Sequence, residues 1–249
     1  MVRPGRKNLL KALIAVPLCF VLYSFHLATP STGLPLSEQL AAMVFGKIDF
    51  KYSYAYIMTI ENIAFIMLFN LMFSTHITTH FRYSCVYVFS RLRDRRRWYA
   101  ARMLEIIICA LIYTLLYVIS VLVICMIVTG RSLDSVTLYR CFMVFLFSFL
   151  IVCSSTLLIN LLALKFGTGA GFFIVEGIIF ALVVIFMLTY DLPWAAYINP
   201  LACLNLFNSP KNTAWVTTAN NLIIFAAVFL GGMKYVSGYD VAMFDAELN

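Results

Sequence analysis

Residues 103–129 read MLEIIICALIYTLLYVISVLVICMIVT and contain a single charged side chain, Glu105. About 20 apolar residues in a helix cross the roughly 30 Å of hydrocarbon in a bilayer, and this run is long enough to do so. Because the hydrocarbon holds no water, a crossing segment must satisfy its own backbone hydrogen bonds, as a helix does. The run is continuously apolar and lacks the alternation of a membrane β-strand. It therefore predicts a transmembrane helix.

Apolar runs of similar length recur along the whole chain. They predict six transmembrane helices, at about residues 9–28, 56–79, 103–129, 138–164, 170–190 and 216–235. The composition agrees, because 63% of the 249 residues are hydrophobic and 12% are charged, with a mean hydropathy of +0.94. A soluble domain has about a quarter charged residues. The segments between the spans are too short for a core of their own, so residues 1–249 are predicted to form a single all-α transmembrane domain.

Basic residues gather on one side of these predicted spans. With the N-terminus inside, all but five of the 18 Lys and Arg residues are cytosolic. The five outside are Lys47, Lys51, Arg131, Arg140 and Lys211. This asymmetry follows the positive-inside rule and predicts that both termini are cytosolic. The net charge of +7 is thus attributed to orientation in the membrane, and nucleic acid is not an expected partner.

Two long segments join the spans on the outer side, at residues 29–55 and 191–215. The second contains Pro193, Trp194, Pro200 and Trp215, and its middle, residues 197–207, is apolar but too short to cross the bilayer. Aromatic residues are enriched at membrane–water interfaces. We therefore expect an outer interfacial helical segment before the last span.

The cytosolic loop at residues 81–102 contains the most concentrated charge in the chain. Its centre is Arg91, Leu92, Arg93, Asp94, Arg95, Arg96, Arg97 and Trp98. No helix breaker interrupts this stretch, so we expect a short surface helix that continues into the third span. Two interpretations of the arginines remain open. They bind anionic lipid of the inner leaflet, at about 1 kcal/mol each, or they dock a cytosolic partner whose surface is acidic or grooved.

In combination these features resemble the permeases of the type-2 exporter branch of ABC transporters, known as ABC-2. The chain has a short basic N-terminus, an Arg-rich loop with a tryptophan at residues 90–98, and Asn199-Pro200 in the outer segment before the last span. We expect the longer amphipathic N-terminal helix of larger relatives to be missing or reduced here. The resemblance implies that Arg91–Trp98 form a coupling helix that docks on a separate ATPase chain.

The resemblance also implies an ATP-driven exporter in the bacterial inner membrane that works with a second permease copy or a similar permease. Cargo classes among small relatives include antimicrobial peptides. The chain has no G-x-x-x-x-G-K-[ST] motif, so ATP and Mg²⁺ are expected on the partner ATPase, with no cofactor in this chain. We expect a transport subunit rather than an enzyme. A secondary transporter or channel is the alternative, and a membrane-embedded enzyme is disfavoured because no catalytic set of residues is present.

Charged residues within the predicted spans need an explanation, because a charge near the bilayer centre costs on the order of 3 kcal/mol. In the family that the chain resembles, the second and fifth spans line the translocation path, which would place Glu61 and Glu176 there as residues that favour a cationic or amphipathic cargo. Glu61 is also close enough to the outer surface for water to reach it. Glu105 is expected to pair with Arg102. Interhelical hydrogen bonds are expected from Asn62, Asn70 and Asn160.

Two further patterns each allow a structural explanation. Gly167 and Gly171 begin the fifth span as a G-x-x-x-G, which permits close helix packing but equally suits a turn between spans. His76 and His80 lie four residues apart near the inner end of the second span. They lack the H-E-x-x-H pattern and an obvious third ligand, so we expect interfacial histidines rather than a metal site.

Overall fold

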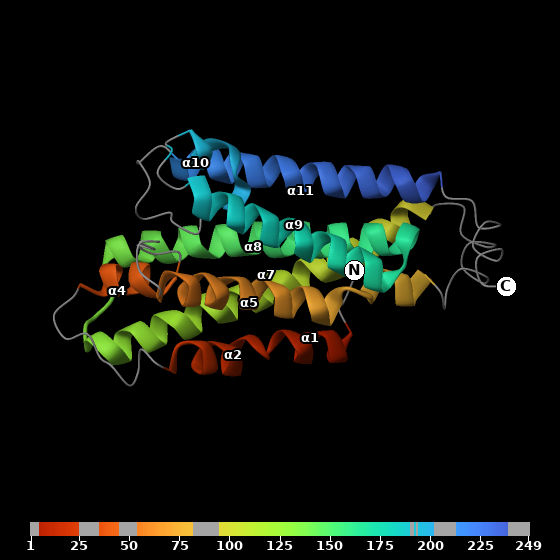
Figure 1. The fold of residues 1–249 in the computed structure, drawn as a ribbon. Coiled ribbons are helices and arrows are strands. Elements are labelled where there is room, and N and C mark those ends of the chain that lie inside the picture. Colours follow the sequence, from red (N-terminus) through yellow and green to blue (C-terminus); the bar gives the residue numbers. More distant parts are fainter. Residues whose placement is uncertain are drawn as a thin grey trace.

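A computed structural model describes residues 5–24, 35–44, 54–81, 95–189, 192, 194–201 and 213–238 of the chain. Within these residues the secondary structure is helical and no strand occurs. The helices run along a common direction and form an elongated bundle (Figure 1). Five of them are long and apolar enough to cross a membrane. The prediction of an all-α membrane protein is confirmed at this level.

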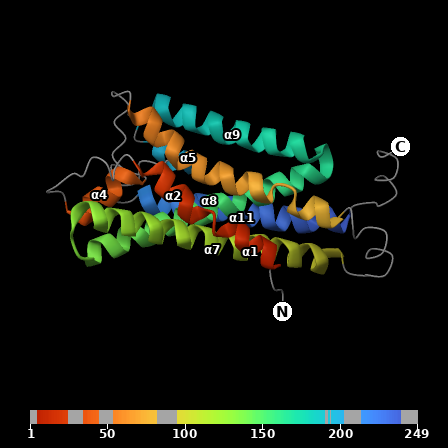
Figure 2. The same ribbon diagram turned by 90° about the horizontal axis from the view of Figure 1, so that it is seen from below.

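The second to sixth predicted spans each correspond to a long helix. These helices are α5 (Tyr54–Phe73), α7 (Arg95–Thr129), α8 (Ser135–Phe166), α9 (Thr168–Thr189) and α11 (Thr213–Ser237). The central helix is α8, which contacts the other four. In its membrane-length apolar stretch, 72% of α8 is buried inside the protein, compared with 33% for α9 and 17% for α11. Figure 2 shows α9 and α5 along one face of the bundle, with α7 on the opposite face.

The first predicted span differs from a continuous helix. It consists of α1 (Arg6–Ala12) and α2 (Ala15–Leu22), which both pack against α7. The break falls four residues before Pro17, whose ring clashes with the carbonyl four positions earlier and which has no N–H to donate. A tighter bond, from the Val16 amide to the Leu13 carbonyl at 3.2 Å, replaces the regular pattern there. The end of the predicted span, residues 25–28, lies outside the described residues.

The second predicted span, residues 56–79, is also interrupted. Helix α5 ends at Phe73, a turn follows at residues 74–75, and a short helix occupies residues 76–81. The Ser74 hydroxyl donates to the Leu71 carbonyl at 3.2 Å, within the last turn of α5. Hydroxyl side chains that bond to nearby carbonyls compete with the helical pattern and bend helices. The interruption therefore arises without glycine or proline.

Two short helices lie toward the end of the bundle that the sequence assigns to the outer side. The first, α4 (Leu36–Met43), was not predicted, and it packs on α7 and α8 with Leu36, Leu40 and Met43 buried. The second, α10 (Ala195–Ile198), is one turn long and lies in the expected interfacial segment. The Asn221 amide of α11 donates to the Pro200 carbonyl just after it, at 3.0 Å. The rest of that segment, residues 202–212, lies outside the described residues.

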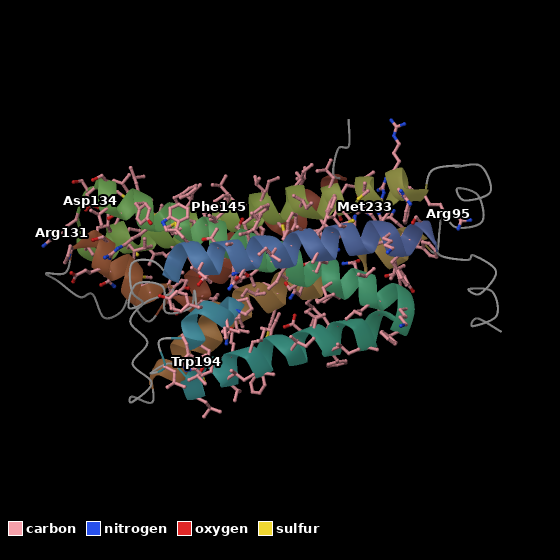
Figure 3. The ribbon with its side chains drawn as sticks, turned by 90° about the horizontal axis from the view of Figure 1, so that it is seen from above. Arg95, Arg131, Asp134, Phe145, Trp194 and Met233 are labelled. Atoms are coloured by element: carbon pink, nitrogen blue, oxygen red, sulfur yellow. The ribbon has the colours of Figure 1, made fainter. Side chains whose placement is uncertain are left out.

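Basic residues concentrate at one end of the bundle. In the described part of the chain this end includes Lys7 and Lys11 in α1, Arg95–Arg97 and Arg102 in α7, Lys165 in the last turn of α8 and Lys234 in the last turn of α11. The opposite end has Arg131 and, in the second turn of α8, Arg140. Figure 3 shows Arg95 and Arg131 at the two extremes. The structure thus places together the residues that the sequence assigns to the cytosolic side.

Candidate functional site

Polar side chains of three central helices meet inside the bundle, around Asn70 of α5. The Asn70 amide nitrogen donates to Glu176 Oε1 of α9 at 2.8 Å. Its amide oxygen accepts from Ser155 Oγ at 2.9 Å and from Thr156 Oγ1 at 2.7 Å, both on α8. Asn70 is completely buried. We call these four residues the Asn70 cluster, and it confirms the interhelical role predicted for Asn70.

Glu176 is the charged member of the Asn70 cluster, and it is 8% exposed. Its Oε1 is bonded to Asn70, whereas its Oε2 is buried and has no hydrogen-bond partner among the described residues. A carboxylate in the membrane is expensive and normally faces a partner or water. The orphan oxygen is therefore a position where a proton, a water molecule or a cationic group would gain a hydrogen bond.

A cavity of about 160 Å³ borders the Asn70 cluster. It lies between α8, α9 and α11, and its lining includes Ser155, Val175, Ile179 and Asn221. Most of the lining is apolar, so the cavity suits a hydrocarbon chain or an apolar side chain better than an ion. Ser155 belongs to both features, so the cavity and the cluster are contiguous.

The break in the second span is bridged by Asn160 of α8. The Asn160 amide nitrogen donates to the Phe73 carbonyl at 2.8 Å, and its amide oxygen accepts from the Ile77 amide at 2.8 Å. The same nitrogen also donates to the Thr156 carbonyl of its own helix, at 2.9 Å. One fully buried side chain thus satisfies the backbone on both sides of the turn. This confirms the interhelical role predicted for Asn160, whereas the side chain of Asn62 lies outside the described residues.

The predicted pairing of Glu105 with Arg102 is also confirmed, with Arg102 Nη1 2.8 Å from Glu105 Oε1. The structure adds a third member from another span, because His76 Nε2 lies 3.0 Å from Glu105 Oε2. The carboxylate and the imidazole are almost fully buried, with 6% and 7% of their side chains exposed. The contact joins the short helix at residues 76–81 to α7, 29 positions along the chain.

The predicted coupling residues fall partly in the described chain. Arg95, Arg96, Arg97 and Trp98 form the first turn of α7, and this helix continues without interruption into the third span. The side chains of Arg96 and Arg97 are exposed. The other predicted members, Arg91, Leu92, Arg93 and Asp94, lie outside the described residues, as does the side chain of Glu61.

The start of α7 is anchored to two other spans. The Trp98 ring meets the buried Phe81 ring edge-on, with the centroids 6.0 Å apart. The buried Tyr99 side chain packs against Gly232 of α11, where a Cβ atom would lie 2.6 Å from the Tyr99 hydroxyl. A bulkier residue at position 232 would therefore displace the Tyr99 ring. The first turn of α7 therefore contacts both the short helix at residues 76–81 and α11.

The two glycines of the G-x-x-x-G have different roles. Gly167 separates α8 from α9 at a φ of +88°, a conformation that favours glycine. Gly171 lies where α9 crosses α8, and a Cβ atom there would be 2.7 Å from the Ala163 nitrogen and 2.9 Å from the Ile159 oxygen. The turn and the close packing that the sequence left as alternatives are thus both present, one at each glycine.

Comparison of the chain with family models, with curated proteins and with solved structures finds no match. The class of protein defined by the fold is an all-helical, multi-pass membrane protein with a buried polar cluster and a basic end.

Proposed function

We propose that the chain is the transmembrane permease subunit of an ATP-driven ABC exporter of the bacterial inner membrane. In this proposal it has six spans with both termini cytosolic, and it works with separate ATPase chains and a second permease. The concentration of basic residues at one end of the bundle supports that orientation. The observation that carries the proposal is the arginine-rich first turn of α7.

The length of α7 supports a docking role for this turn. A helix of 35 residues is about 52 Å long, whereas the hydrocarbon layer is about 30 Å thick. The apolar part begins near Met103, so the residues before it extend about 12 Å beyond the apolar segment. Arg96 and Arg97 are exposed there, on a rigid helix, in a form that an acidic surface on an ATPase could bind.

The contacts of the first turn give the proposal a mechanical basis. Closure of the ATPases on ATP would displace the start of α7. Trp98 would pass that displacement to Phe81 of the second span, and Tyr99 would pass it to α11 through Gly232. These contacts let one docking event tilt several spans, which a switch between inward-open and outward-open states requires.

The Asn70 cluster is the proposed point of cargo contact. Glu176 offers a carboxylate oxygen without a partner beside an apolar cavity, and this pair of features suits an amphipathic cargo that carries a positive charge. Glu61, on the same span as Asn70, is proposed as a second acidic residue of the path. Glu176→Gln should reduce transport of a cationic peptide while leaving the folded protein intact, because glutamine can still accept the Asn70 hydrogen bond. Unchanged transport in this variant would show that Glu176 does not contact the cargo.

Co-purification with an ATPase tests the proposed function. The genomic neighbourhood is first searched for a reading frame that encodes a P-loop ATPase. The chain is co-expressed with that ATPase, with Arg95, Arg96 and Arg97 changed to Glu in one variant. The control is Arg131→Glu, which reverses a charge at the opposite end of the bundle. The triple variant should lose the ATPase, and the control should retain it. Equal recovery of the ATPase by the triple variant would show that the arginines do not dock it and would leave lipid anchoring as their role.

A secondary transporter is a second candidate, favoured by the break at residues 74–75. Interrupted helices line the substrate sites of many such transporters, and a buried carboxylate such as Glu176 suits proton coupling. Proteoliposomes that contain the chain alone separate the two candidates. Uptake driven by a proton gradient without ATP supports the secondary transporter, whereas a requirement for the ATPase and ATP supports the exporter.

A further inference from the structure

Three side chains that commonly bind metal ions meet near the basic end of the bundle. His76 and His80 lie four residues apart on the short helix at residues 76–81, and therefore share one face of it. Glu105 reaches them from α7. One ligand atom of each side chain lies within 4.8 Å of the others. The sequence does not reveal this set, because its third member comes from a different span.

The distances are close to those of a zinc site. Bonds of 2.0–2.2 Å to nitrogen and oxygen in a tetrahedral site place neighbouring ligand atoms about 3.3 Å apart. His76 Nε2 and Glu105 Oε2 are already 3.0 Å apart. The widest pair must approach by roughly 1.5 Å to meet that tetrahedral spacing. Rotation of the His80 side chain supplies this change, since His80 is only half-buried and its ring lies 4.8 Å from that of His76.

The surroundings hold the carboxylate in position. Arg102 Nη1 contacts both oxygens of Glu105, at 2.8 and 2.9 Å. Hydrogen bonds of this kind orient metal-binding carboxylates and are a regular part of metal sites. Two neutral imidazoles and one carboxylate give the three ligands a charge of about −1, which the neighbouring Arg102 offsets, so an ion is held here by direct bonds to the ligands rather than by net charge. The partial exposure of His80 gives the ion a way in.

We propose that His76, His80 and Glu105 bind a divalent transition-metal ion, with zinc as the best fit. Two imidazoles and a carboxylate are a known set of three protein ligands for zinc, and they leave a fourth position for water or another ligand. The ion replaces the direct hydrogen bond between His76 and Glu105 and ties the segment after the helix break to α7. The site is independent of the exporter proposal, since it needs only this chain.

Zinc titration of the purified chain in detergent tests the site. The protein is first stripped with a chelator, its accessible cysteines are alkylated, and ZnCl₂ binding is followed by calorimetry. The described cysteines are buried, which limits their competition for the ion. His26→Ala is the matched control, because His26, His76 and His80 are the three histidines of the chain. The wild type and the control should bind one Zn²⁺ per chain, and His80→Ala should bind it at least tenfold more weakly.

The absorption spectrum of bound Co²⁺ gives a second measurement, which reports the ligands of the ion directly. Co²⁺ bound by two histidines and a carboxylate absorbs as a tetrahedral centre without the intense near-ultraviolet bands of thiolate ligands. This spectrum should appear in the wild type and in His26→Ala and should be lost in His80→Ala, with all three proteins eluting alike on gel filtration. The proposal is overturned if the wild type binds no Zn²⁺ at micromolar concentration, if His80→Ala binds as tightly, or if the cobalt spectrum shows thiolate ligands.

Discussion

Removal of the Asn160 amide should destabilise the protein by about 2–4 kcal/mol. In Asn160→Ala the Phe73 carbonyl and the Ile77 amide lose their partners inside the bundle, and a third bond, to the Thr156 carbonyl, is lost as well. A buried polar group left without a partner costs about 1–3 kcal/mol. Side-chain hydrogen bonds in membrane proteins average about 0.6 kcal/mol each, so three of them set a lower value near 2 kcal/mol.

The control for this prediction is Ser148→Ala. Ser148 lies on the same helix and is fully buried, but its hydroxyl has no hydrogen-bond partner among the described residues. Its removal should leave the free energy of unfolding unchanged or slightly higher. Both variants are unfolded in mixed micelles by titration with a denaturing detergent. Hydrogen exchange at the Ile77 amide gives a local measurement, and it should accelerate in Asn160→Ala alone.

A small loss of stability in Asn160→Ala would contradict this prediction. If Asn160→Ala loses less than about 0.5 kcal/mol, the turn at residues 74–75 does not need its bridge, and the cost of unpaired groups has been misjudged. A large loss of stability with unchanged exchange at Ile77 would also count against it, because the loss would then come from repacking rather than from the backbone groups.

Three further perturbations follow from the geometry. Gly171→Ala should cost about 1–3 kcal/mol, because the new Cβ meets the backbone of α8 at 2.7 Å, whereas Gly177→Ala on the same helix meets nothing within 4 Å and should be neutral in the same unfolding assay. Trp98→Ala should cost about 0.5–1.5 kcal/mol through its lost ring contact and should lower ATPase-coupled transport more than ATPase binding. Hydrogen bonds from the Thr137 hydroxyl and amide to the Asp134 carboxylate lower the pKa of Asp134 in the folded protein. The ionised carboxylate therefore stabilises the fold at any pH above the pKa that Asp134 has in the unfolded chain, and this stabilisation is lost as the pH falls through the lower pKa of the folded protein. Asp134→Ser keeps a cap without a titrating group, and its stability between pH 5 and pH 2 should therefore depend less on pH than that of the wild type.

The sequence predicted the long helices well because hydropathy is a local property. The ends of α8 and α9 lie within about one turn of the predicted spans. The break in the first span was open to prediction, since Pro17 lies inside the apolar run. The break after Phe73 could not be predicted, because serine and threonine are also found in uninterrupted membrane helices. In addition, Asn160, which satisfies the backbone groups on both sides of the turn, lies on another helix, 83 residues beyond Ile77 along the chain.

The partner of a polar side chain was predicted where it lies on the same helix, whereas for bonds between helices the polar residue was predicted but its partner was not. Arg102 and Glu105 are three residues apart, and helix geometry alone brings them together. His76 joins them only because α7 and the second span pack side by side, which hydropathy cannot specify. For the same reason the sequence predicted that Asn70 makes an interhelical hydrogen bond and that Glu176 lines a path, but it did not predict that the two bond to each other, because that depends on how the helices pack.

The central place of α8 has a consequence for how the protein is made. The Ile77 amide and the Asn160 side chain that accepts its hydrogen bond are 83 residues apart. At synthesis rates of about 5–20 residues per second, the second span leaves the ribosome roughly 4–17 s before its partner exists. During that interval the Phe73 carbonyl and the Ile77 amide need water, lipid headgroups or an insertion factor at the membrane surface as partners. The second span is therefore expected to settle to its final depth only when α8 arrives.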